Sequence, residues 1–273
     1  MKFEIATVVN RTDVLEANLL QSPDVRSGRV DVSSILDAKS AAAGYNPYLR
    51  ERNSAGVVSA LVHQDVYLPP GWVSRVTRQI AELEERACNW GVLGVWGIAS
   101  DGGFHGRTWC TGSNREFVGV SDSSLPAEVD SIDEIVIIIN PEVGLCFDEK
   151  MPGFHLYAAD IARQASSQGY KTYAIDAPVV HNSRQNLQVF DSHFFAAYKF
   201  MQQKYGEQLP LRTCTVPITR FGVPLYKGWL RNEYRRHVKR PPTRDRDRRP
   251  EWRSQELGYE KGESSLREGD ENG

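Results

Sequence analysis

The stretch AGVVSALVHQDVYLPPGW, residues Ala55 to Trp72, carries the strongest signals of fold in the sequence. Its apolar first half predicts a short buried strand. The strand ends on His63 and Asp65, and three residues separate Asp65 from a Pro-Pro-Gly break. After the break, apolar residues are spaced for one face of an amphipathic helix: Val73, Val76, Ile80 and Leu83. The stretch therefore predicts a strand and a helix, with two polar side chains at the carboxyl end of the strand.

Strands and helices alternate on both sides of this stretch. Strands are predicted at Phe3 to Val9, near Arg29 to Val32, in WGVLGVWGIAS and VDSIDEIVIIIN, and in the segment that runs into His181. Helices are predicted in VLEANLLQS, in SAAAGYNPYLRER, from about Tyr157, and from about Asp191 to Tyr205. This alternation is typical of an α/β fold with helices on both faces of a sheet. Such sheets bind ligands outside the carboxyl ends of their strands.

The composition is that of an ordinary globular protein, with 40% hydrophobic residues and a formal net charge of -2. No overall positive field would attract nucleic acid, so we expect no nucleic-acid partner. The four cysteines are widely spread and form no CxxC pair, which favours free thiols. No segment is typical of a signal peptide or a membrane span, so we expect a cytoplasmic protein.

The last part of the chain has a different composition. RNEYRRHVKRPPTRDRDRRP holds nine Arg or Lys residues against three acids, and an acidic segment follows it. Both segments are poor in apolar residues, which is typical of solvated tails. We therefore predict one domain over residues 1–226 and a charged, disordered tail over residues 227–273. The basic part is either a solvated tail or a weak contact with anionic lipid head groups, peripheral to the inner face of a membrane.

His63 and Asp65 are candidate metal ligands because side chains at i and i+2 of an extended chain point to the same side. His181, at the end of another predicted strand, is a candidate third ligand. One carboxylate, imidazole nitrogens and open positions for phosphate would suit Mn²⁺ or Mg²⁺. Alternatively, His63 caps a loop and His181 is an ordinary surface residue.

Several motifs together resemble a known enzyme family. SAAAGYN, LVHQDVYLPPGW, WGVLGVWG, VDSIDE and FDEKMPGFHLYAADIARQASSQGYKTYAIDAPVVH follow the order and spacing of family 2 glycosyltransferases of the GT-A type. Within that family, the chain is most similar to the branch related to the StrF-like domain of streptomycin biosynthesis, in which HQDV replaces the usual Asp-x-Asp. The resemblance covers roughly residues 1 to 205 and implies a single-domain GT-A fold with a central mixed, Rossmann-like sheet flanked by helices.

The resemblance also implies roles for individual residues. Asp65 would bind both the nucleotide diphosphate and the metal, with His63 and His181 as the other metal ligands. The remaining nucleotide-pocket positions are Thr7, Asn10, Ser40 and Asn46. For Asn10 and Ser40, helix capping and turn formation are equally good explanations.

The catalytic base is less clear, because the family's acid after Tyr157 is replaced by Ala158. Asp160 and His155 are the candidate replacements, and Asp133 matches the acceptor side of the family's cleft. Asp160 could instead be an acid that stabilises a helix N-terminus.

The expected function is transfer of a sugar, with inversion, from a nucleoside diphosphate sugar to a hydroxyl of a glycan, a lipid-linked acceptor or a small molecule. Two alternatives stay open. One is a sugar-nucleotide-binding protein without turnover, which Ala158 favours. The other is a metal-dependent phosphohydrolase built from His63, Asp65, His155 and His181.

Overall fold

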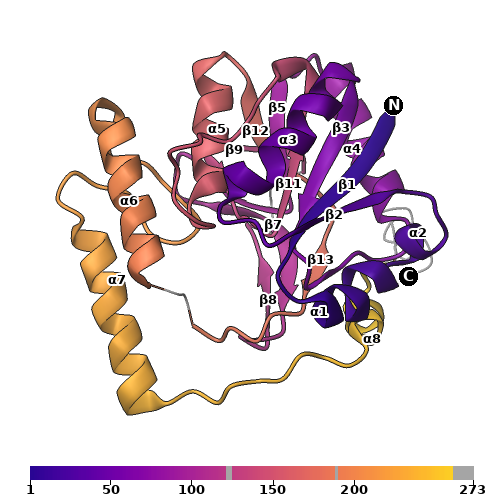
Figure 1. The fold of residues 1–273 in the computed structure, drawn as a ribbon. Helices are drawn as coiled ribbons and strands as arrows, with labels where there is room; N and C mark the ends of the chain where they lie inside the picture. Colours follow the sequence, from indigo (N-terminus) through magenta and orange to yellow (C-terminus); the bar gives the residue numbers. More distant parts are fainter. Residues whose placement is uncertain (121–124, 188–189, 261–273) are drawn as a thin grey trace, which may run out of the picture.

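A seven-stranded mixed sheet forms the centre of the protein in the computed structural model, which describes residues 1–120, 125–187 and 190–260 (Figure 1). In spatial order the strands are β2 (Val32–Leu36), β1 (Lys2–Val9), β3 (Val57–Val62), β11 (Val136–Ile139), β5 (Trp90–Gly94), β12 (Lys171–Ala174) and β9 (Ala127–Val129). β1 is parallel to β2 and β3, and β12 is parallel to β5. β11 is antiparallel to both of its neighbours, and β9 is antiparallel to β12.

A second, smaller sheet continues from the carboxyl end of the first. Its order is β10 (Ser131–Ile132), β6 (Trp96–Ile98), β7 (Phe104–Cys110), β13 (Val179–His181) and β4 (Val66–Tyr67), and β8 (Arg115–Val118) pairs with β7. The chain passes from β3 to β4 through only three residues, His63 to Asp65. The stretch that ends the central strand therefore also begins the second sheet.

Helices cover both faces of the central sheet. α3 (Ala41–Ser54) and α5 (Tyr157–Ser167) pack on one face, in a core that includes Leu61 and Ile137. α4 (Trp72–Glu85) packs on the other face, against Val62 and Ile138. Adjacent residues of one strand point to opposite faces, so β3 and β11 contribute to both cores. The predicted central mixed sheet flanked by helices is confirmed.

Before residue 223, the other helical elements are shorter or lie at the edge of the body. They are α1 (Thr12–Ala17), α2 (Pro23–Arg26) and α6 (Ser192–Lys204), with 3-10 turns at Leu19–Gln21, Pro141–Val143 and Gly206–Gln208. Within the described ranges, no helix is both long and apolar enough to cross a bilayer.

The helix predicted after the Pro-Pro-Gly break is confirmed as α4. Gly71 precedes it with a φ of 73°, which a glycine adopts without strain, and the four predicted core residues (Val73, Val76, Ile80 and Leu83) are all buried. The predicted late helix is α6, and the Asp191 side chain caps it by accepting a 2.8 Å hydrogen bond from the Phe194 amide.

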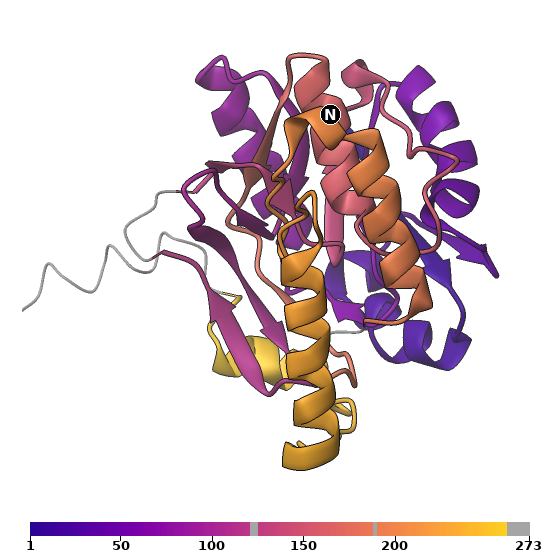
Figure 2. The ribbon, with the colours of Figure 1, turned by 90° about the vertical axis from the view of Figure 1, so that its left-hand side faces the viewer.

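The prediction of disorder after residue 226 is wrong for the described part of that segment. Helix α7 (Val223–Tyr234) crosses the predicted boundary, a π-helical turn (Arg235–Lys239) follows, and a further helix, α8 (Pro250–Glu256), packs on the body. Figures 1 and 2 show α7 beside α6 at the edge of the molecule. Residues 261–273 lie outside the described ranges.

One buried residue anchors this segment after α8. Tyr259 is only 1% exposed and packs with Tyr67, Trp109 and Val180 of the second sheet. Its carbonyl oxygen accepts a 3.0 Å hydrogen bond from Arg75. Composition averaged over the whole tail conceals this anchor, because one aromatic residue hardly changes the average.

Candidate active site

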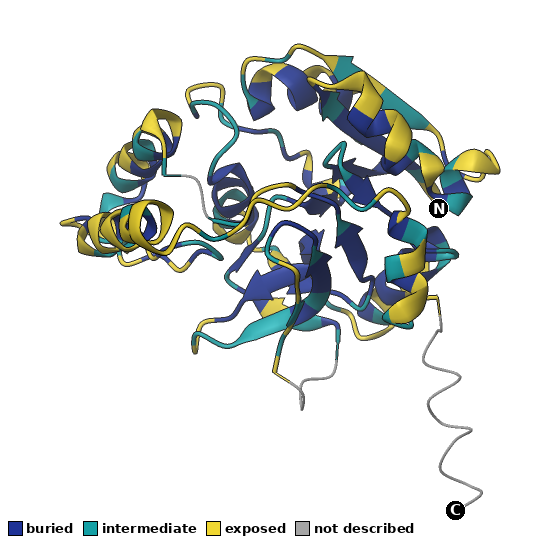
Figure 3. Cartoon of the chain, turned by 90° about the horizontal axis from the view of Figure 1, so that it is seen from below, coloured by how far each residue is buried: buried dark blue, intermediate teal, exposed yellow. Residues whose placement is uncertain are grey.

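A cavity of about 580 Å³ lies where the carboxyl ends of β1 and β3 meet the second sheet. It corresponds to the place that the sequence predicts for a ligand. The predicted site residues in its lining are Asn10, His63, Asp65, Asp133, His155 and His181. Figure 3 shows the two sheets mostly buried, with exposed helices and loops around them.

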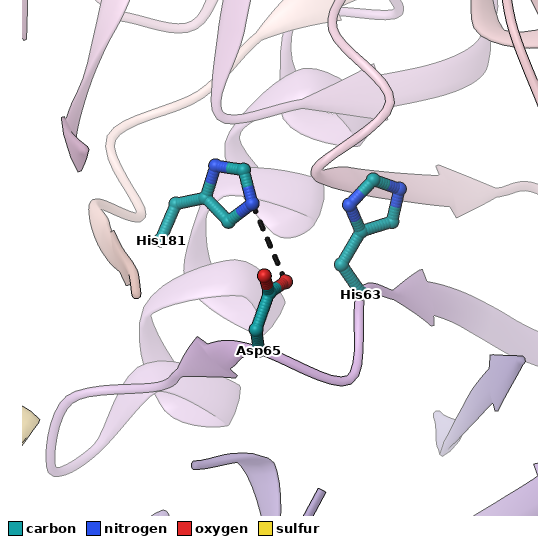
Figure 4. A group of neighbouring side chains, drawn as sticks. All are labelled: His63, Asp65 and His181. Atoms are coloured by element: carbon teal, nitrogen blue, oxygen red, sulfur yellow. Dashed lines mark ion pairs between the residues drawn. The ribbon is translucent and has the colours of Figure 1, made fainter. Parts of the chain in front are cut away.

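His63, Asp65 and His181 meet in this cavity (Figure 4). One ligand atom from each lies within 4.8 Å of the others, and His181 Nε2 is 3.3 Å from Asp65 Oδ1. The two imidazole rings are 5.8 Å apart between centroids. The prediction that His181 comes from a distant strand to join the other two is therefore confirmed as geometry.

The backbone holds these three side chains in place. The His63 amide donates to the Ile135 carbonyl oxygen at 3.1 Å, just past the end of β3. His181 is paired with Val66 in the register of β13 and β4, and the next amide, that of Asn182, donates to the Asp65 carbonyl oxygen at 2.8 Å. Because both sheets fix the triad, little reorganisation would be needed to bind an ion.

The charges of the triad support one another. Burial disfavours a charged imidazole, but Asp65 outweighs this effect and raises the pKa of His181 to about 10. Burial also opposes ionisation of Asp65, yet His181, His63 and Arg246 hold the pKa of this carboxyl well below its usual range. Burial lowers the pKa of His63 despite the charge of Asp65. The triad thus offers one carboxylate, one neutral imidazole and one imidazole that must lose its proton before it can bind a metal.

Tyr157 and Glu134 extend this site, and sequence reasoning missed both. The Tyr157 hydroxyl lies 3.1 Å from His63 Nε2 and 3.4 Å from the Glu134 carbonyl oxygen. The Glu134 carboxyl accepts a 2.8 Å hydrogen bond from the Leu156 amide. Burial, followed by the charge of Asp133, raises the pKa of Glu134 to about 8. The signal for Glu134 in the sequence was the last acid of VDSIDE, next to Asp133, which we had singled out.

Glu134 should make stability depend on pH. Its pKa is higher in the folded protein than in the unfolded chain, so its contribution is complete below about pH 4.5 and is lost as the pH rises through about 8. As the pH rises from 5 to 8, we expect the free energy of unfolding of the wild type to fall by on the order of 2–3 kcal/mol relative to that of Glu134→Gln. Urea unfolding at several pH values measures this, and parallel curves for the two proteins would contradict it.

Two other predicted residues in the cavity have local partners. Asp133 Oδ1 accepts a 3.0 Å hydrogen bond from the Ile135 amide, which fixes its carboxylate in the turn before β11. His155 Nε2 lies 3.5 Å from Asp191 Oδ1, and its ring meets Phe194 edge to face. Burial lowers the pKa of His155, with Asp191 opposing the shift. Both side chains are positioned to meet a ligand.

Four predicted site residues are not in the cavity lining. Thr7 is fully buried in β1, and the Ser40 hydroxyl caps α3 by accepting from the Ala43 amide at 3.1 Å. For Ser40 the capping interpretation is the one that the structure supports. Asn46 both donates to and accepts from the backbone of Phe147 at 2.8 Å, so its carboxamide is already satisfied. The nucleotide-binding prediction for Asn46 is corrected to a structural role.

The prediction that Asp160 is the catalytic base is also corrected. Asp160 is 0% exposed, and its carboxylate is held at 2.8 Å by Lys204, by the Tyr205 hydroxyl and by Gln164. A buried carboxylate that is held by three partners and does not line the cavity cannot take a proton from an acceptor bound there. Ala158 is buried as well, so α5 supplies no acid to the cavity from either position.

The C-terminal segment brings a cation to the triad that sequence reasoning missed. Arg246 Nη2 lies 3.7 Å from Asp65 Oδ2. The same stretch is tied to the body at residue 247, where Asn182 accepts a 2.7 Å hydrogen bond from the Asp247 amide and donates at 2.8 Å to the Asp247 carbonyl oxygen. Asn186 donates to the Pro242 carbonyl oxygen at 2.8 Å. Because the segment was predicted to be disordered, no part of it entered the predicted site.

Comparison with known proteins gives distant similarities. No family model matches the chain. The chain is 29% identical over 175 residues to a protein described as ATP synthase subunits region ORF 6 from Fuscovulum blasticum, and the match covers 61% of this chain and 66% of that protein. The chain thus spans slightly less than two thirds of that relative.

Two solved structures are similar to the chain at low scores. The mannosyltransferase PcManGT from Pyrobaculum calidifontis, in complex with GDP-Man and Mn²⁺, has a TM-score of 0.46 at 10% identity, over 87% of this chain and 70% of that one. TarS from S. aureus has a TM-score of 0.42 at 14% identity, over 77% and 66%. Because these similarities are weak, the side chains of the cavity are the better guide to function.

Proposed function

We propose that the chain is a glycosyltransferase of the GT-A type that uses a nucleoside diphosphate sugar and a divalent cation. The observation that carries the proposal is the triad of His63, Asp65 and His181 in a cavity that also holds Asp133. The motifs of the sequence resemble the family 2 branch, and the triad residues occupy the motif positions that this resemblance implies. We further propose inversion at the sugar and an acceptor that is a glycan, a lipid-linked molecule or a small molecule.

The donor atoms of the triad fit a first-row divalent ion. One carboxylate oxygen and two imidazole nitrogens suit Mn²⁺ better than Mg²⁺, which prefers oxygen ligands and keeps its waters. When bound, such an ion stabilises the negative charge that develops on a departing diphosphate. Asp65 would serve as the anionic ligand, and the hydrogen bond to Tyr157 orients His63.

Arg246 would add a second positive charge on the diphosphate side. Its guanidinium lies beside Asp65, and an arginine pairs well with phosphate oxygens. Asn10 also lines the cavity, and its side chain accepts a hydrogen bond from Gln64, the residue between His63 and Asp65. We propose that these residues face the donor, together with Asp65.

Arg246→Gln is expected to weaken binding of a nucleoside diphosphate in the presence of Mn²⁺ by about ten- to a hundredfold, because a hydrogen bond between two charged groups is lost. Mn²⁺ alone should bind at least as well, since the cation next to Asp65 is removed. Arg184→Gln is the matched control, because Arg184 pairs with exposed Asp245 in the same segment. Calorimetric titration measures both variants, and equal losses in the two would contradict the proposed role.

The acceptor hydroxyl must lose a proton, and Asp133 is the proposed base. Its carboxylate lines the cavity and is near enough for its charge to oppose the lowered pKa of His63. Glu134, with a pKa of about 8, is largely protonated at neutral pH and is a poor base there. His155, which also lines the cavity, is the second candidate.

A binding protein without turnover is the alternative that one observation favours. At the position after Tyr157, where the family carries an acid, this chain has Ala158. The nearby Asp160 is held in an ion pair with Lys204. A phosphohydrolase is less well supported, because the triad contains a single carboxylate.

Measuring donor hydrolysis and sugar transfer separately from nucleotide binding tests the proposed function. We expect Mn²⁺-dependent binding of a nucleoside diphosphate together with turnover of its sugar conjugate. Binding without turnover on any acceptor would support the inactive alternative, and phosphatase activity without nucleotide binding would support the hydrolase.

A further inference from the structure

Helix α7 and the π-helical turn after it carry an apolar stripe that is largely exposed, although the Tyr226 ring meets Phe195 of α6 edge to face, with 5.8 Å between the ring centroids. Its members are Val223, Tyr226, Leu230, Tyr234 and Val238, which are 54–63% exposed. They follow one another at intervals of three, four, four and four residues, which places them on one face of a helix. Phe221, just before the helix, is 81% exposed. Apolar residues at this density and regularity are unusual on a surface in water.

The opposite face of the same helix is already packed on the protein. Leu225 and Asn232 are buried there, and Gly228 lies so close to Phe190 and Val216 that an added Cβ would stand 3.1 and 3.3 Å from them. Figures 1 and 2 show α7 starting beside α6 at the edge of the body and extending past the end of that helix. The fold therefore packs one face of α7, and apart from the contact of Tyr226 with Phe195 the stripe lies exposed.

Basic residues surround the stripe. Residues 220–240 contain seven of them, Arg220, Lys227, Arg231, Arg235, Arg236, Lys239 and Arg240, against one acid, Glu233. Glu233 is already paired with Arg236 and His237. By helical spacing, Lys227 and Arg231 lie along one border of the stripe, and long basic side chains can extend toward head groups while their neighbours insert. This face thus combines apolar insertion with strong positive charge.

We propose that α7 with its π-helical turn is a docking surface for an anionic lipid bilayer. A helix with one apolar face and basic flanks lies in the plane of the membrane interface, with its apolar side chains among the acyl chains. A second copy of the chain fits less well, since a two-fold contact through this face would bring the same basic residues together. The lipid surface supplies both the apolar medium and the opposite charge.

The proposed docking surface does not depend on the chemistry of the cavity. A short segment of the chain nevertheless connects this surface to the cavity. Ten residues, 240–249, lead from the end of this helical region to α8 and include Arg246, which contacts Asp65. Under the proposed function, attachment here would hold the cavity at the membrane surface, which is where a lipid-linked acceptor would be found.

Vesicle sedimentation of the full chain tests the proposal. Vesicles of phosphatidylcholine alone are compared with vesicles that also contain phosphatidylglycerol, at low and high salt. We expect binding to the anionic vesicles at least tenfold stronger than to the neutral ones, and weakened by salt. The double variant Leu230→Ser with Tyr234→Ser should bind anionic vesicles about tenfold more weakly. Lys227→Gln with Arg231→Gln should weaken binding at low salt and reduce its salt dependence, because two of the seven basic residues are lost.

Matched controls come from exposed residues elsewhere. Leu36→Ser, at a 66% exposed position of β2, and Arg86→Gln, on the exposed end of α4, should leave vesicle binding unchanged. All substituted side chains are exposed, so thermal unfolding should show intact folds. The proposal is overturned if the wild type does not bind anionic vesicles at low salt, or if the α7 variants bind as the wild type does. Self-association that Leu230→Ser abolishes, without vesicle binding, would also overturn it.

Discussion

Asp65→Asn is expected to reduce Mn²⁺-dependent affinity for a nucleoside diphosphate by at least about a hundredfold. Residues that only support a ligand typically change metal affinity by ten- to a hundredfold, so the loss of the one anionic ligand should reach or exceed that range. Asn keeps the size of the side chain, and the Asp65 backbone still accepts its hydrogen bond from Asn182. The loss should therefore appear in metal-dependent binding, measured by calorimetric titration with and without Mn²⁺.

The control is Asp31→Asn, because Asp31 is exposed and outside the cavity. It removes the same charge and should change affinity less than twofold, within the range of a surface substitution. His63→Ala is the informative companion, since it shows whether His63 binds the ion or only holds the loop. If Asp65→Asn bound nucleotide with the same metal dependence as the wild type, the triad would not be the metal site.

Asp133→Asn is expected to lower kcat by about 10²- to 10⁴-fold, the usual contribution of a positioned general base. KM for the donor should change little, because the proposed base meets the acceptor. The Asn side chain can still accept from the Ile135 amide, so the turn before β11 should be preserved. Steady-state transfer kinetics, with donor affinity measured independently, tests this prediction.

Asp130→Asn provides the comparison for this variant, since Asp130 is three residues away and not in the cavity lining. It should retain activity within about twofold. If Asp133→Asn kept full turnover and His155→Ala lost it, the base would be His155.

The central sheet and the triad were predictable because each depends on local signals. An apolar run that ends in His63 and Asp65 marks a strand end, and the β-rich run before His181 marks another. In an α/β fold such ends gather at one edge of a sheet, which led to the two distant segments being placed together. The meeting is correct, but β13 belongs to the second sheet, which was not predicted. The antiparallel position of β11 between β3 and β5 did not follow from these local signals.

The errors come from contacts over long sequence distances. Asp160 at the start of a helix looks free in the sequence, and only the fold brings Lys204 and Tyr205 to it. Asn46 resembles a pocket residue until the backbone of Phe147 is found against it. The charged tail was predicted to be disordered because its composition is polar, yet Tyr259 packs among two aromatic residues and a valine from three other segments. Single contacts of this kind do not affect periodicity or composition.

The central claim is that this cavity binds a nucleoside diphosphate sugar through a divalent ion, and one measurement tests it most directly. Sugar conjugates of UDP, GDP, CDP and dTDP are titrated against the wild-type protein by calorimetry, with Mn²⁺ and with a chelator. We predict that at least one of them binds with micromolar affinity or better when Mn²⁺ is present, and about a hundredfold more weakly without it. Binding that is the same with and without Mn²⁺, or no binding of any of the four, would contradict the account.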